Sequence, residues 1–107
     1  MNDILPAQFA DLQHWADQWG HGKRSERMRQ RVTSRYEDVE SFYKAVHPRM
    51  PEILEYLNNI PLSNMTPSAQ ALLRLGMAMI ECARCVEVWK AVDIDAVSPE
   101  RLRHYYE

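Results

Sequence analysis

The sequence predicts an all-α fold, a small bundle of four to five helices, antiparallel and up-and-down, in one domain over residues 1–107. Apolar residues recur at helical spacing along the chain, and the alternation that marks strands is missing. Glycine occurs only three times, and five of the six prolines fall where helices begin or bend. With 46% hydrophobic and 26% charged residues, the chain has the composition of an ordinary folded protein.

The first helix is expected over residues 6–19. Pro6 suits the first turn of a helix, and Gly20 and Gly22 end it. The apolar side of this helix consists of Phe9, Leu12, Trp15, Ala16 and Trp19. These positions share one face, so the segment is expected to be amphipathic.

A long second helix over 25–46 and a short third helix over 51–59 are expected next. Ser25 can cap the second helix, whose apolar positions keep helical spacing for about six turns. Pro48 ends or kinks it, because the residue before a proline is pushed out of the α region. Pro51 then starts the third helix.

The strongest helix is expected over 67–91, followed by a short helix over 99–105. Pro67 marks the start of the first, and its apolar residues wrap most of the circumference. That pattern is typical of a central helix, packed on several sides or on another copy of itself. Gly76 costs this helix up to ~1 kcal/mol against Ala, which indicates a close helix crossing.

A cluster of basic residues is the most distinctive feature of the sequence. Six of the thirteen Lys and Arg residues fall between Lys23 and Arg35. Four of them would share a helix face about 80° wide and form an arginine ridge, namely Arg24, Arg27, Arg31 and Arg35. With Trp15 and Trp19 nearby, the ridge could hold an anionic or aromatic ligand or an acidic protein surface, because guanidinium groups bind carboxylates and phosphates and stack on rings.

The charges around the ridge support a second interpretation. Acidic residues follow it directly from Glu37, and the formal net charge of the chain is -2. The arginines would then form a solvated face with internal pairs, such as Arg35 with Asp38, each contributing about 0.2–0.5 kcal/mol. The same charge balance argues against a nucleic-acid binder, which needs a basic field to neutralise phosphates.

Glu81 and Arg84 lie within the most hydrophobic stretch of the chain. A buried carboxylate there would be a tuned acid, a base or a ligand anchor, since uncompensated buried charges are costly and collect at functional sites. Alternatively, Arg74, Glu81 and Arg84 form one polar strip, because they fall within about 80° of each other on a helix. That strip would face solvent.

The sequence indicates no metal site, no cofactor and no catalytic residue. Cys82 and Cys85 have the C-x-x-C spacing, but a zinc site needs two further ligands that no second motif supplies. The two cysteines are therefore expected to be small buried residues. No nucleophile, P-loop or dinucleotide-binding motif occurs either.

These observations favour an interaction module over an enzyme. We expect a small accessory or regulatory subunit that self-associates or docks on a protein partner through apolar helix faces, with the arginine ridge as a rim. Because helix 67–91 is apolar on most sides, a homodimer through it or a stable complex with a larger protein partner is expected. The absence of a signal sequence and of a bilayer-spanning stretch, with only two cysteines, indicates the cytoplasm.

Two alternatives stay open. The first is a binder, or minor enzyme, for a small aromatic or apolar anionic molecule held in a helix-lined pocket with an arginine clamp. The second is a nucleic-acid binder through the basic helix at 23–35. All three functions use the same arginines, so the packing around these arginines decides between the functions.

Overall fold

The computed structural model describes residues 4–90, and within this range the chain is built of helices and contains no strand. The all-α class predicted from the sequence is confirmed. In chain order the elements are η1 (Ala7–Leu12), α1 (Gln13–Trp19), α2 (Arg24–Thr33), α3 (Tyr36–Val46), η2 (His47–Arg49), α4 (Met50–Asn58), η3 (Leu62–Asn64), α5 (Pro67–Arg84) and η4 (Cys85–Trp89). The predicted helix 99–105 lies outside the described residues.

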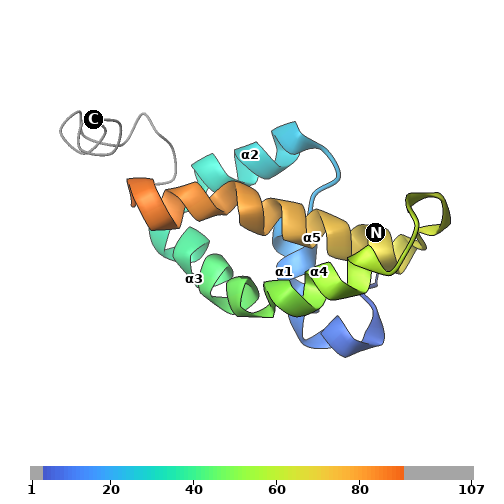
Figure 1. Cartoon of the computed structure of the whole chain (residues 1–107). Coiled ribbons are helices and arrows are strands. Elements are labelled where there is room, and N and C mark those ends of the chain that lie inside the picture. The colour runs from blue at the N-terminus through green and yellow to red at the C-terminus, as the bar shows by residue number, and fades with distance from the viewer. Residues whose placement is uncertain (1–3, 91–107) are drawn as a thin grey trace, which may run out of the picture.

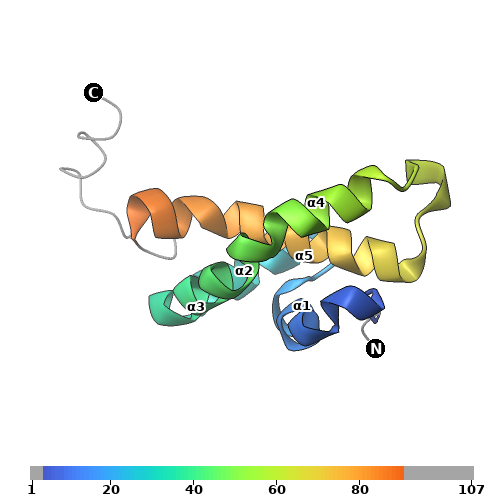
Figure 2. The same ribbon diagram turned by 60° about the horizontal axis from the view of Figure 1, so that its bottom comes forward.

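Helix α5 is the centre of the bundle. In Figure 1 it lies between α2 on one side and α3 and α4 on the other, and the turned view of Figure 2 shows α1 below it. Helices α1, α3 and α4 all pack against it. The largest fully buried side chains are Trp19, Phe9, Phe42, Ile53, Leu72 and Leu75. They come from η1, α1, α3, α4 and α5, so one core joins these elements.

The start of α5 follows the sequence prediction. Pro67 occupies the first turn, and the Thr66 hydroxyl oxygen accepts a hydrogen bond from the Ala69 amide at 3.1 Å. The predicted helix 67–91 corresponds to α5 and η4 together, and η4 is a π-helical continuation. Lys90 then adopts the left-handed conformation with φ 55°, which ends the helical run.

The predicted helix 6–19 consists of two parts. Phe9 has non-helical torsion angles (φ −116°, ψ 17°), and the chain takes 3-10 geometry in η1 before α1 begins. Phe9 is fully buried, so packing outweighs regular helix geometry here. The predicted stop at Gly20 is confirmed, and a Cβ at this position would lie only 2.8 Å from the carbonyl oxygen of Ala16.

The single helix predicted over 25–46 is wrong, because the chain breaks it into α2 and α3. Ser34 and Arg35 between them have extended backbones, with ψ angles of 160° and 151°. Glu37 and Asp38 lie in the first turn of α3, where negative charge stabilises a helix N-terminus. The acidic run after the basic cluster therefore marks the start of a new helix.

Two hydroxyl side chains bond to backbone carbonyl groups at the end of α2. The Thr33 hydroxyl donates to the carbonyl of Arg29 at 2.6 Å, and the Ser34 hydroxyl donates to the carbonyl of Gln30 at 2.5 Å. Ser and Thr are weak helix formers because their side chains bond to the backbone in this way. Such bonds also occur inside a continuing helix, as at Ser41 in α3, so they accompany the break but do not cause it alone.

Candidate functional site

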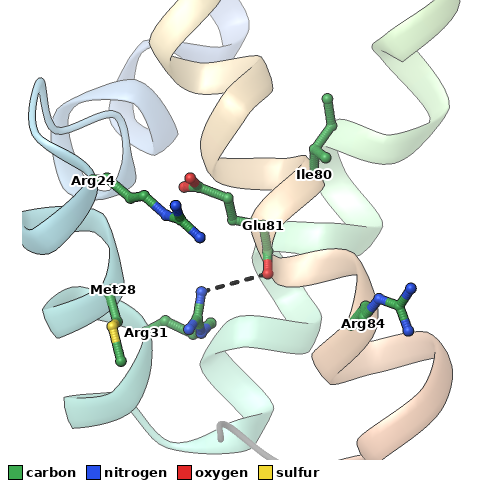
Figure 3. Close-up of a pocket in the computed structure, with 6 residues that line it drawn as sticks. All are labelled: Arg24, Met28, Arg31, Ile80, Glu81 and Arg84. Atoms are coloured by element: carbon green, nitrogen blue, oxygen red, sulfur yellow. Dashed lines mark hydrogen bonds between the residues drawn. The ribbon is translucent and has the colours of Figure 1, made fainter.

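A surface pocket of about 290 Å³ lies between α2 and α5 and brings together residues far apart in the sequence (Figure 3). We call it the α2–α5 pocket. Its lining residues are Arg24, Met28, Arg31, Ile80, Glu81 and Arg84. Four of these six are charged and two are apolar, so the pocket combines a basic wall with an apolar edge.

One wall of the pocket is held by a buried ion pair. Arg27 is only 5% exposed, and its guanidinium binds both carboxylate oxygens of Glu81, with Nε donating to Oε1 at 2.7 Å and Nη2 to Oε2 at 3.2 Å. Nη1 also donates to the carbonyl groups of His21 and Gly22, at 3.0 and 3.3 Å. This two-pronged geometry is the strongest form of the Arg–carboxylate interaction.

The ion pair attaches α2 to α5 through Arg27 and occupies the carboxylate of Glu81. Of the ten residues of α2, Arg27 alone is buried, so this helix docks on α5 through a charge and not through an apolar face. The Glu81 side chain is 24% exposed, and both of its oxygens are held by Arg27. Internal pairing of the ridge arginines is one of the two interpretations of the sequence, and the pair of Arg27 with Glu81 agrees with it except that Arg27 is buried.

Two other ridge arginines face the pocket. Arg24 is exposed, and in Figure 3 its guanidinium points into the space between the two helices. Arg31 donates from Nη1 to the backbone carbonyl of Glu81 at 3.4 Å, which is a long hydrogen bond. Its Nε is shielded from solvent and has no acceptor among the described residues. Arg84 lies across the pocket on α5.

The apolar edge was not identified among the candidate site residues by sequence reasoning. Met28 on α2 is 49% exposed, and Ile80 on α5 is 57% exposed. Met77, one turn before Ile80, is 39% exposed and extends the apolar surface along α5. Large apolar residues clustered on the surface mark contact sites more often than scattered ones do. The sequence feature that predicts this exposed edge is that helix 67–91 is apolar on more sides than one small chain can cover.

The remaining candidate residues lie elsewhere. Trp19 is 2% exposed and stacks on Phe42, with ring centroids 4.8 Å apart, and Trp15 contacts the same ring at 5.9 Å. Both tryptophans belong to or flank the core and do not line the pocket. Arg35 is in the break after α2 and forms the predicted i,i+3 ion pair with Asp38, at 3.6 Å.

Residues 4–90 provide no group of three or more His, Cys, Asp or Glu side chains that could hold a metal ion. Cys82 and Cys85 are both buried, as the sequence predicts for small core residues, and neither forms a disulfide. Burial raises the pKa of Cys82 to about 12, so its thiol is protonated near neutral pH. Across the same range, every helix is too short or too polar to traverse a lipid bilayer.

The chain matches no known family model, no curated protein and no solved structure. The chemistry of the α2–α5 pocket follows from its own side chains. Glu81 is its single acidic residue and is held by Arg27, whereas three of its lining residues are arginines. Such a lining suits the binding of an anion that carries an apolar group.

Proposed function

We propose that this protein is a non-catalytic interaction module that docks an acidic, partly apolar segment of a partner protein on the α2–α5 pocket. The supporting observation is that exposed Met28 and Ile80 lie beside the guanidinium groups of Arg24 and Arg31. An apolar contact with a charged rim is the usual composition of a protein interface. The arginines would set the register of the segment, and the apolar residues would hold it.

The charge of the pocket favours an acidic partner over a second copy of this chain. In a two-fold symmetric contact the same patch faces itself, so the arginines of one copy would approach those of the other. Glu81, the acidic lining residue, is already held by Arg27. The homodimer expected from the sequence is therefore the competing occupant of this surface.

The extent of the apolar surface favours a protein segment over a small molecule. Met77 lies outside the pocket lining, and with Ile80 it continues the apolar edge along α5. A segment in extended or helical form could contact the pocket and this stripe together. Such a module would act as an accessory or regulatory subunit in the cytoplasm, where cysteines such as Cys82 and Cys85 stay reduced.

A selection from a random peptide library displayed on phage tests the proposal with the immobilised full chain. We expect the enriched peptides to combine Asp or Glu with apolar residues. Ile80→Asp and Arg24→Glu should each weaken binding of these peptides by about tenfold in fluorescence anisotropy, because they remove the apolar contact or reverse a charge. Both residues are exposed, so the fold should tolerate the changes.

Arg29→Glu is the matched control, because Arg29 is on α2 but does not line the α2–α5 pocket. It should leave binding of the selected peptides nearly unchanged. Enrichment of peptides without acidic residues, or equal losses for Arg29→Glu and Arg24→Glu, would contradict the proposal. Arg27 is unsuitable for this test, since a change there would break the buried ion pair.

A further inference from the structure

We infer that the α2–α5 pocket is a binding site for a phosphate monoester, carried on a phosphorylated side chain of the docked segment. The inference rests on the proposed function and names the anionic group of the partner. It follows from the charges that line the pocket, from the unused donors of Arg31 and from the apolar edge.

The lining charges are unequal in number. Two guanidinium groups of α2, those of Arg24 and Arg31, lie at the pocket together with one carboxylate. That carboxylate belongs to Glu81, and Arg27 binds both of its oxygens, so the Arg27–Glu81 pair has no net charge. The positive charge of Arg24 has no ion-pair partner in the part of the chain that the structure describes. The pocket therefore presents net positive charge to a ligand.

Arg31 has donors to spare. It makes one long hydrogen bond from Nη1, at 3.4 Å, to the backbone carbonyl of Glu81. Its Nε is out of contact with solvent and, within residues 4–90, has no acceptor. Because Nε is closed to solvent, a ligand in the pocket would bind the Nη groups of Arg31 instead. A ligand with several oxygen atoms could accept hydrogen bonds from these groups, since the Nη1 bond to Glu81 is long.

A phosphate monoester fits this arrangement better than a carboxylate does. It carries a charge of about −1.5 to −2 at pH 7 and three terminal oxygens, whereas a carboxylate carries one charge and two oxygens. Arg24 and Arg31 would approach these oxygens from α2, whereas the Arg84 side chain on α5 points away from these two arginines (Figure 3). Clusters of arginine are the usual means by which proteins recognise phosphorylated side chains.

The apolar edge indicates that the phosphate is carried on an organic group. Met28 and Ile80 line the same pocket and are about half exposed. They would contact the carbon atoms of the modified side chain, and methionine adapts well to an aromatic ring. Free inorganic phosphate would gain nothing from this edge and should bind more weakly.

Nuclear magnetic resonance titrations of the full chain at pH 7.5 test the inference with phenyl phosphate, benzoate and inorganic phosphate as probes. We expect phenyl phosphate to shift the Met28 and Ile80 methyl signals and to bind at least about fivefold more tightly than either other probe. Lowering the pH from 7.5 to 5 should weaken phenyl phosphate binding, because its second ionisation lies near pH 6, while benzoate binding should change little.

Arg24→Gln and Arg31→Gln should each weaken phenyl phosphate binding by about tenfold, and Arg29→Gln should not. Equal affinity for benzoate and phenyl phosphate, or the same loss with Arg29→Gln, would overturn the inference. So would equal affinity for inorganic phosphate, which would leave no role for the apolar edge. The library peptides carry no phosphate, so the two proposals can fail separately. Selection of acidic peptides together with no binding of phenyl phosphate would overturn the phosphate site and leave the proposed docking of an acidic segment intact.

Discussion

The guanidinium of Arg27 is the clearest case in this protein of a charged side chain that has a structural role. It is 5% exposed and donates to Glu81 and to two backbone carbonyl groups of the segment before α2. A buried charge is tolerated when its partners satisfy it this fully. The same arrangement removes Arg27 and the Glu81 carboxylate from the groups that a ligand could reach.

Breaking this ion pair should destabilise the fold. We expect Glu81→Gln to lower the free energy of unfolding by about 1–3 kcal/mol, because Arg27 would keep its buried charge without a counter-charge. Replacing both residues, Arg27→Met with Glu81→Leu, should recover most of that loss. Urea denaturation followed by circular dichroism measures the effect.

Glu55→Gln is the control for this experiment, since Glu55 is an exposed carboxylate on α4. It should change the free energy of unfolding by less than about 0.5 kcal/mol. A Glu81→Gln variant as stable as the Glu55→Gln variant would show that the pair contributes nothing.

The buried thiol of Cys82 gives a prediction for alkaline pH. Burial raises its pKa from 9.0 to about 12 in the folded chain, so the unfolded chain loses this proton first. The contribution of Cys82 to stability is therefore complete below pH 9 and is lost as the pH rises from 9 toward 12. The Cys82→Ala variant should show a smaller fall in the free energy of unfolding over this range.

Tyr43 titrates in the same direction, because its hydrogen bond with Glu87 raises its pKa to about 12. Cys82→Ala should therefore reduce the alkaline loss of stability without abolishing it. Alkylation of the native chain with iodoacetamide at pH 8 provides a second measurement. If Cys82 is alkylated as fast in the folded chain as in urea, its thiol is neither buried nor raised in pKa, and this prediction is wrong.

The helices differ in how they attach to the bundle. Helices α1, α3 and α4 bury apolar side chains against α5, whereas α2 contributes one buried residue, Arg27. The extended backbones of Ser34 and Arg35 separate α2 from α3. One wall of the α2–α5 pocket is therefore α5, which the apolar core holds in place. The other wall is α2, which the Arg27–Glu81 ion pair holds in place.

Helix α5 contains a glycine that its packing does not require. Gly76 faces α4, where an added Cβ would lie 3.7 Å from the Met50 Cε and 3.8 Å from the Ile53 Cγ2. The close crossing expected at this glycine is thus with α4 of the same chain. Both distances are ordinary van der Waals contacts, so alanine fits.

We expect Gly76→Ala to stabilise the protein by about 0.5–1 kcal/mol, since alanine loses less backbone entropy than glycine in a helix. Thermal unfolding followed by calorimetry measures the change. A matched substitution, Gly20→Ala, should instead destabilise, because its Cβ would meet the Ala16 carbonyl at 2.8 Å. Destabilisation by Gly76→Ala would mean that the α4–α5 contact is tighter than these distances indicate.

The arrangement of the whole bundle covers α5 on most of its sides and leaves the stripe of Met77 and Ile80 exposed. This stripe borders the arginines of the α2–α5 pocket. A second copy and an acidic partner are the two occupants that compete for it. The charge of the pocket favours the partner.

Light scattering of the isolated chain separates these two occupants. If the stripe serves an acidic partner, the mass at micromolar concentration should be that of one chain, 12.6 kDa. Ile80→Asp should leave that mass unchanged. A mass of two chains that Ile80→Asp reduces to one would contradict the proposal and would support the homodimer expected from the sequence.

Local patterns predicted the helices well where the residues that decide a helix are neighbours in the chain. The proline and threonine before α5, the glycine after α1 and the apolar spacing of α5 all act within one or two turns. The same patterns missed the break after α2, because Thr33 and Ser34 favour a helix end only weakly and the apolar spacing runs on through them.

The composition of the site was present in the sequence as well, since the arginine ridge and Glu81 were both candidates. Their partnership was not, because Arg27 and Glu81 are 54 residues apart and meet only when α2 lies against α5. Spacing along a helix gives the face on which a side chain lies, but it does not say which helix covers that face. The tertiary structure therefore decided which arginine is buried and which arginines remain at the surface beside Met28 and Ile80.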